Sequence, residues 1–170
     1  SEMVLRNQAQ GRMICTTDFA NAIADSEIIF IAVGTPDGGD GRADLTGVLK
    51  AAAMIGKAAT GYRIVVTKST VPVGTAPKVL AEIKKHSSHP VDVVSNPEFL
   101  REGRAIDDFM MPERVVIGAD SEKARETMKE LYTPFVQETG NPILTMSVSS
   151  AELTKYACNA FLALKISFAN

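Results

Sequence analysis

The chain has 170 residues, of which 45% are apolar and 22% charged, with 18 basic and 20 acidic side chains. This length suits one domain with a substantial core. The net charge of −2 and the lack of any apolar run of ~20 residues exclude a basic nucleic-acid surface and a membrane span. Two distant cysteines, Cys15 and Cys158, indicate a reducing compartment such as the cytoplasm rather than a disulfide scaffold.

Short apolar runs alternate with helical patterns along the chain. Buried strands are expected at 28–33, 63–67, 91–94, 115–117 and 143–146. Helices are expected over 44–59, 75–85 and 121–135, the last with Ser121 as its N-cap. This alternation predicts an α/β fold with a parallel sheet and helices on both faces.

The last segment predicts one long helix that runs to the end of the chain. Ser149 stands three residues before Glu152, the spacing of a capping box. Lys155 and Asn159 are four residues apart among apolar neighbours. On a mostly buried helix they would need partners and would suit oxyanion stabilisation. The alternative is an exposed ion pair between Glu152 and Lys155.

Ligands of such sheets bind where the strands end at their carboxyl side. This rule selects the loops 34–36, 68–72 and 95–103. Ser69 and Thr70 could hold a phosphate, a ribose or a water, or could simply cap the following helix. Thr35 has the same two interpretations, and for Lys68 the sequence supports no more than screening of a strand end.

The loop 95–103 carries two glutamates. Asn96 is a good N-cap, and a short helix after it would place Glu98 and Glu102 on one face. Paired carboxylates at such a site can bind ribose hydroxyls or act as a general base. The alternative is a solvated surface turn in which Arg101 neutralises one glutamate.

Other signals point away from particular ligands. Residues 39–44 lack the third glycine of a dinucleotide-binding fingerprint, and no other segment supplies one. His86 and His89 have no cysteine or acidic neighbours, so no metal is expected.

Several long motifs together resemble a known family. They are Val33-Gly34-Thr35-Pro36 and the segments 68–75, 96–103, 112–118 and 150–163. In order and spacing the chain resembles the nucleotide-sugar dehydrogenases, and within them the UDP-glucose 6-dehydrogenases, from about Gly11 to its last residue.

The resemblance implies a Rossmann-like NAD-binding domain over 1–147, truncated at its N-terminal strand. It also implies that 148–170 is the start of a long central helix that joins domains and builds a homo-oligomer. The parent enzyme would convert UDP-glucose to UDP-glucuronate by two successive NAD-dependent oxidations at C6. The family's glycine-rich turn and nucleophilic-cysteine motif do not occur in the chain, so it is expected to be an internal fragment, inactive alone.

The resemblance also implies roles for individual residues. The implied cofactor-binding residues are Gly34, Thr35, Pro36, Ser69, Thr70 and Glu102. The implied catalytic residues are Thr70, Glu98, Lys155 and Asn159, with Thr70 and Glu98 handling a water and Glu98 as the base. The implied substrate-binding residues are Glu98, Phe99, Leu100, Lys155 and Asn159.

Two alternatives remain open. The substrate could be another nucleotide sugar, GDP-mannose or UDP-N-acetylmannosamine, although Val71–Gly74 and the Phe99-Leu100 context favour UDP-glucose. The chain could also be a non-catalytic Rossmann-like binding or assembly module.

Overall fold

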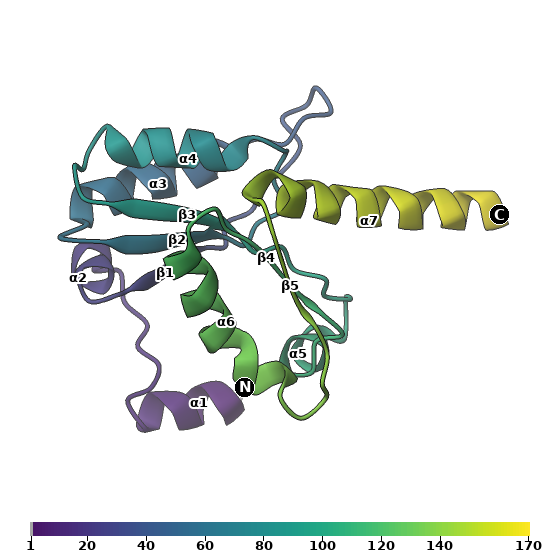
Figure 1. Ribbon diagram of the computed structural model, residues 1–170, viewed down its shortest axis with the longest axis horizontal. Helices are drawn as coiled ribbons and strands as arrows, with labels where there is room; N and C mark the ends of the chain where they lie inside the picture. Colours follow the sequence, from purple (N-terminus) through teal and green to yellow (C-terminus); the bar gives the residue numbers. More distant parts are fainter. Residues whose placement is uncertain (1) are drawn as a thin grey trace.

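The computed structural model describes residues 2–170 as a five-stranded sheet with helices on both faces (Figure 1). The strands are β1 Ile28–Ile31, β2 Arg63–Thr67, β3 Val91–Ser95, β4 Val115–Gly118 and β5 Ile143–Met146. The helices are α1 Glu2–Ala9, α2 Phe19–Ala24, α3 Thr46–Ala58, α4 Thr75–Lys84, α5 Ala105–Met110, α6 Glu122–Val136 and α7 Val148–Ala169. The five strands, the helices expected at 44–59, 75–85 and 121–135, and the long last helix are all present, and α1, α2 and α5 are additional.

The sheet order is β1-β2-β3-β4-β5, and one of its pairings differs from the expectation. β1 with β2, β2 with β3, and β4 with β5 are parallel. β3 and β4 instead meet antiparallel, through the single pair Ser95 and Gly118. A parallel pair needs a crossover that returns the chain to the start of the strand. The link between β3 and β4, which contains α5, stays at the carboxyl end of β3 beside Lys68 and Asn96, so β4 runs back. The Rossmann-like α/β class is confirmed, with a mixed sheet.

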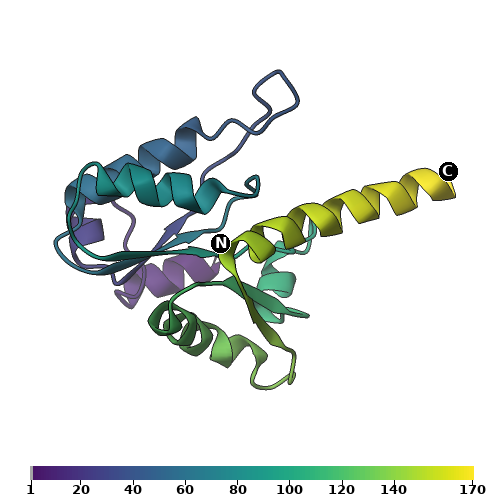
Figure 2. The same ribbon diagram turned by 45° about the horizontal axis from the view of Figure 1, so that its top comes forward.

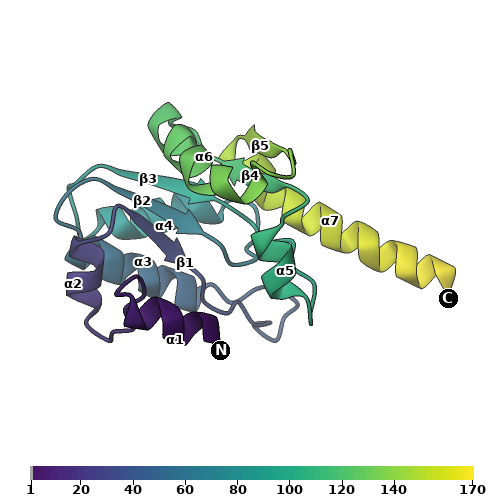
Figure 3. The ribbon, with the colours of Figure 1, turned by 90° about the horizontal axis from the view of Figure 1, so that it is seen from below.

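Alternate side chains of the central strands build two separate cores. Val65 on β2 packs with residues of α2, α3 and α4, whereas its neighbours Ile64 and Val66 pack with α6. This alternation is the period of two that a strand covered on both faces requires. Figure 3 shows the sheet between the α3–α4 layer and α6.

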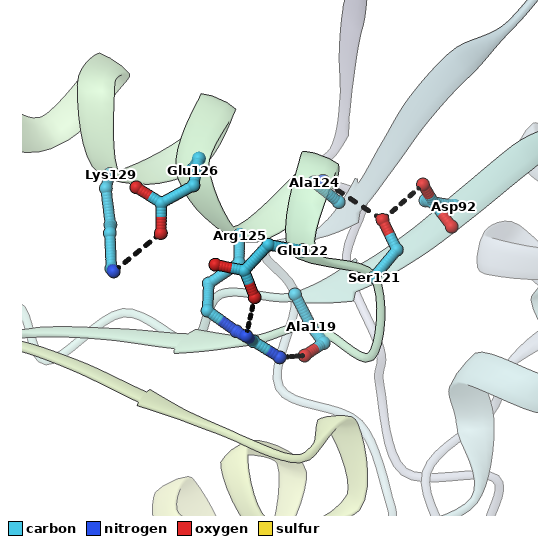
Figure 4. Close-up of polar contacts among 8 residues, drawn as sticks. All are labelled: Asp92, Ala119, Ser121, Glu122, Ala124, Arg125, Glu126 and Lys129. Atoms are coloured by element: carbon cyan, nitrogen blue, oxygen red, sulfur yellow. Dashed lines mark hydrogen bonds and ion pairs between the residues drawn. The ribbon is translucent and has the colours of Figure 1, made fainter.

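α6 is attached to the sheet by a polar cluster at its first turn (Figure 4). Ser121 caps the helix as expected: its hydroxyl oxygen accepts from the Ala124 N–H at 3.0 Å and donates to Asp92 on β3 at 2.7 Å. The Tyr62 hydroxyl donates to the same Asp92 oxygen at 2.6 Å. Burial, and then the hydrogen bond to Asp92, raise the pKa of Tyr62. The cluster therefore fixes the start of α6 against β3.

α7 begins at Val148, with Ser147 as its N-cap. The Ser147 hydroxyl accepts from the Ser150 N–H at 3.3 Å, so the capping box expected at Ser149 and Glu152 is wrong. Only the first turns of α7 are buried, and the rest projects away from the domain (Figure 1). None of the helices in residues 2–170 combines the length and the apolar character needed to cross a bilayer.

The loop between β1 and α3 also projects from the domain (Figure 2). A bridge between Asp37 and Ala43 closes its tip. The Asp37 carboxylate accepts from the N–H groups of Gly39 and Gly41 at 2.9 and 3.1 Å. In the turn at the carboxyl end of β1, Gly34 and Pro36 are exposed and Thr35 is half-buried.

The tightest helix contact lies between α3 and α4. A Cβ atom on Gly56 would lie 2.6 Å from the Ile83 carbonyl oxygen, a backbone atom that cannot move aside easily. Gly47, in the same helix, has its nearest neighbours at 3.6 Å, an ordinary contact distance.

We expect Gly56→Ala to lower the free energy of unfolding by about 1–3 kcal/mol, because the added methyl group overpacks the α3–α4 contact. The control Gly47→Ala should be neutral or stabilising by up to about 1 kcal/mol, since alanine favours a helix over glycine. Urea unfolding of both variants measures the difference. Equal free energies of unfolding for the two variants would contradict the close packing.

Candidate functional site

A largely buried ion pair joins α7 to the loop that follows β3. The Lys155 ammonium lies 2.8 Å from a carboxylate oxygen of Glu98, and the side chains are 9% and 29% exposed. The other Glu98 oxygen accepts from the Leu100 N–H at 2.7 Å. Burial raises the pKa of Glu98, but the hydrogen bonds from Lys155 and Leu100 outweigh it and hold that pKa below its usual value of 4.5. Glu98 is therefore a carboxylate at neutral pH and can accept a proton.

The aromatic ring of Phe99, the residue after Glu98, lies against two cationic side chains. The Lys155 ammonium lies 5.4 Å from the ring centroid, and the Arg114 guanidinium carbon lies 4.4 Å from it. Both distances suit a cation–π contact. Phe99 thus favours cationic side chains beside Glu98.

A second buried network lies beneath Glu98. Asn96 is only 1% exposed. Its side-chain oxygen accepts from the Lys68 ammonium at 3.1 Å and from the Tyr132 hydroxyl at 2.5 Å. Its amide nitrogen donates to the Val116 carbonyl at 2.8 Å. Asn96 therefore connects β2, β4 and α6 at the end of β3.

The network shifts the pKa values of its two titratable groups. Burial lowers the pKa of Lys68 to about 8; the negative charge of Glu98 opposes this shift and the positive charge of Lys155 adds to it. Burial raises the pKa of Tyr132 to about 12. Besides Lys155, Lys68 is therefore a second cation near Glu98, and burial disfavours its charged form because the ammonium loses part of its hydration.

The prediction of a short helix after Asn96 is wrong. Residues 96–101 have no helical structure, and the helix in this loop, α5, begins only at Ala105. The Asn96 side chain is held in the buried network and is not free to cap. Glu98 turns toward Lys155, whereas Glu102 lies in an exposed turn. The two carboxylates are therefore not a pair on one helix face.

The alternative interpretation of this loop, in which Arg101 neutralises one glutamate, is also wrong. Its guanidinium donates to both carboxylate oxygens of Asp108, at 3.0 and 2.6 Å. These hydrogen bonds lower the pKa of Asp108 to about 2. Arg101 thus pairs with Asp108 in α5 and neutralises neither glutamate.

The loops after β1 and β2 are joined by two hydroxyl groups. The Ser69 hydroxyl donates to the Val33 carbonyl at 2.6 Å, and the Thr35 hydroxyl donates to the Thr70 carbonyl at 2.8 Å. Neither Ser69 nor Thr70 caps α4, whose N-cap is Gly74. The capping interpretation of these residues is therefore wrong.

These loops offer oxygen acceptors suited to part of a dinucleotide. With their protons engaged, the Thr35 and Ser69 oxygens keep lone pairs that ribose hydroxyls could use, and the Thr70 hydroxyl makes no hydrogen bond within residues 2–170. Gly34 has no atom within 4 Å of the place where a Cβ would stand. The chemistry of this set fits the ribose portion of NAD.

A cavity of about 310 Å³ lies beside Glu98 and reaches Tyr132 on α6. Lys68 and Asn96 line it, together with residues of the segment 97–115. It adjoins the ion pair through Glu98 and Phe99.

The remaining expected site residues lie further out. Gly34 and Pro36 are exposed in the turn after β1, Leu100 follows Phe99 at the surface, and Asn159 is exposed one turn beyond Lys155. Sequence reasoning missed the roles of Lys68, Asn96 and Tyr132. The lysine and the asparagine that directly follow two apolar strands were the available signal. Within residues 2–170, no three His, Cys, Asp or Glu side chains gather as a metal site would require.

Most of the chain matches one family model. Residues 1–136 match the model of the UDP-glucose/GDP-mannose dehydrogenase family, NAD binding domain. The chain belongs to this family. The match covers the sheet up to the end of α6, including both loops with hydroxyl contacts and the Glu98 loop.

Curated relatives and solved structures agree. The chain is 49% identical to UDP-glucose 6-dehydrogenase TuaD of Bacillus subtilis over 100% of its length and 36% of that protein, and 48% identical to UDP-glucose 6-dehydrogenase of Pseudomonas aeruginosa over 99% and 38%. A UDP-glucose dehydrogenase structure from Pyrobaculum islandicum has a TM-score of 0.93 at 43% identity, covering 99% of this chain and 39% of that one. A GDP-mannose dehydrogenase structure from Pseudomonas aeruginosa has a TM-score of 0.90 at 36% identity, covering 98% and 39%. The chain thus spans less than half of these proteins.

The pKa of Lys68 gives a pH-dependent prediction. The unfolded chain holds the Lys68 proton up to its usual pKa of 10.5, and the folded chain releases it near 8. Between these values the unfolded state binds more protons, so the stability of the folded state rises with pH. Lys68→Met lacks this titration. From about pH 7.5 to about pH 9.5 the free energy of unfolding of the parent should therefore rise by about 1–2 kcal/mol more than that of the variant.

Urea unfolding of both proteins at the two pH values measures this gain. The groups that face Lys68, namely Glu98, Lys155, Asn96 and Tyr132, remain in both proteins. A free-energy difference that stays constant with pH would show that Lys68 is solvated and contradict its burial.

Proposed function

We propose that the chain is the NAD-binding part of an enzyme that oxidises UDP-glucose to UDP-glucuronate at C6. The observation that carries the proposal is the Lys155–Glu98 pair, which lies beside the hydroxyl-bearing loops at the carboxyl end of the sheet. Overall, one water and two NAD⁺ are consumed as the alcohol becomes a carboxylate. NAD, when bound, accepts a hydride in each oxidation.

The residues of this chain would supply the polar groups of the reaction. The Lys155 ammonium would stabilise negative charge on the C6 oxygen, with the Asn159 amide one turn beyond it. The Glu98 carboxylate would take a proton from a water, which the Thr70 hydroxyl would help to hold. Phe99 and Leu100 would contact the sugar.

The cofactor would lie across the first two loops. Gly34 and Pro36 are exposed in the turn after β1, with Thr35 half-buried between them, and Ser69 and Thr70 offer hydroxyls after β2. Glu102, at the surface of the next loop, would complete the cofactor side. The names of the relatives near 48% identity support UDP-glucose over GDP-mannose or UDP-N-acetylmannosamine.

We further propose that residues 1–147 form the cofactor domain and that 148–170 begin a central helix covered by a second copy of the chain. The far half of α7 exposes apolar side chains on several sides: Phe161, Leu162, Leu164, Ile166 and Phe168. An apolar surface of this extent is typical of an interface.

Two free cysteines support a cytoplasmic location.

Turnover of UDP-glucose tests the proposal. In the complete protein that carries this chain, we expect two NADH per UDP-glucose, followed by absorbance. Lys155→Met should lower kcat by about 10²-fold or more, because the developing negative charge loses its cation. The control Lys50→Met, an exposed lysine of α3, should keep the parent rate.

Three outcomes would contradict the proposal. An unchanged kcat in Lys155→Met would remove the lysine from the reaction. Turnover of GDP-mannose or UDP-N-acetylmannosamine in place of UDP-glucose would replace the substrate. No turnover of any nucleotide sugar would favour a binding or assembly module.

A further inference from the structure

One buried carboxylate on α7 lies outside the Lys155–Glu98 pair. Glu152, on the second turn of α7, is 2% exposed. Its two oxygens accept from the backbone N–H groups of Gly74 and Ala76, at 2.7 and 2.8 Å. A buried acidic group needs such partners. The contact joins α7 to a part of the chain that is distant in sequence.

The partners of Glu152 are the free N–H groups at the start of α4. Gly74 is the N-cap of α4, has a φ of 90° and provides no side-chain cap. The first N–H groups of a helix have no partner within it, and its N-terminus attracts negative charge. Glu152 therefore supplies from α7 the cap that the sequence of α4 lacks. It also fixes the end of the loop that carries Ser69 and Thr70.

Glu152 and Lys155 lie three residues apart and face the same side of α7. Both are buried, and each contacts a different loop at the carboxyl end of the sheet. Gly118 on β4 closes the third side: a Cβ there would lie 2.5 Å from the Ala151 Cβ. Because these contacts surround the first turns of α7, the position of Lys155 depends on them.

We propose that Glu152 is a positioning residue that fixes the start of α7 against α4 and thereby keeps Lys155 in contact with Glu98. This inference rests on the proposed function only in giving the Lys155–Glu98 pair a catalytic use. The link couples the loop on the cofactor side to the ion pair on the substrate side. Glu152 itself touches neither Glu98 nor a reacting atom.

Carbon-detected NMR of the Glu98 carboxyl group tests the proposal in the full chain. Glu152→Gln keeps the shape of the side chain. Its amide NH₂ group, however, would face one of the two backbone N–H groups and could not accept that hydrogen bond. The first turns of α7 should shift, and Lys155 should move away from Glu98. The charged groups that face Glu98 are Lys155 and Lys68. We expect the pKa of Glu98 to rise by about 1 unit, and the Gly74 and Ala76 amides to lose protection from hydrogen exchange.

Two controls separate positioning from general stability. Glu130→Gln, an exposed glutamate of α6, should leave the Glu98 titration unchanged. Gly56→Ala should lower stability yet also leave that titration in place. If Glu152→Gln fails to fold, Glu152→Asp keeps the charge with a shorter reach and should give a smaller rise in the same direction.

The proposal is overturned if Glu152→Gln folds with a lower free energy of unfolding while the pKa of Glu98 stays at its value in the parent. It is also overturned if the Gly74 and Ala76 amides stay protected. The titration needs no turnover, so a failure of the proposed function leaves this result intact. In the complete enzyme, the acid limb of the kcat pH profile should move upward with the pKa of Glu98.

Discussion

The contact between Lys155 and Glu98 governs the arrangement of the carboxyl end of the sheet. It brings a helix from the end of the chain onto the loop after β3, and most of both side chains leaves solvent. A buried ion pair adds little net stability, because desolvation offsets the attraction, but losing one partner costs about 3–5 kcal/mol when both are fully buried. The cost is smaller here because Glu98 is 29% exposed. The pair therefore acts mainly as a positional constraint.

The surrounding contacts follow from this constraint. The Lys155 cation keeps Glu98 ionised, and the nearby Lys68 is held by Asn96 at a pKa lowered by burial. Asn96 in turn ties three elements together beneath the pair. At the same end of the sheet, Glu152 holds α4 and α7 together. The polar residues at this edge thus form connected contacts and not separate surface charges.

Much of the fold follows from local patterns in the sequence. Mostly apolar runs of three to six residues predicted all five strands, since buried strands need largely continuous apolar side chains. The Ser121 cap was also predicted, because capping depends on residues close in sequence. The antiparallel pairing of β3 with β4 could not be predicted in this way, because it depends on where the chain returns after α5.

The site was less predictable for the same physical reason. Glu98, Lys155, Thr35, Ser69 and Thr70 were selected by their place at strand ends, by a helical pattern and by a family resemblance. Three other polar side chains were assigned to neighbours in sequence: Glu152 to a capping box, Arg101 to a glutamate, and Asn96 to a helix cap. In the structure each of these side chains contacts a residue of another element or a later turn. Local spacing shows which side chains can interact but not which distant partner folding will bring to them.

A double-mutant cycle on Lys155→Met and Glu98→Gln tests the central contact most directly. The free energies of unfolding of the parent, both single variants and the double variant give the coupling energy of the pair. The structure predicts a favourable coupling of about 1 kcal/mol or more, because the two charged groups are in contact and partly buried. A coupling near zero would show that the side chains do not meet in solution and would contradict the account.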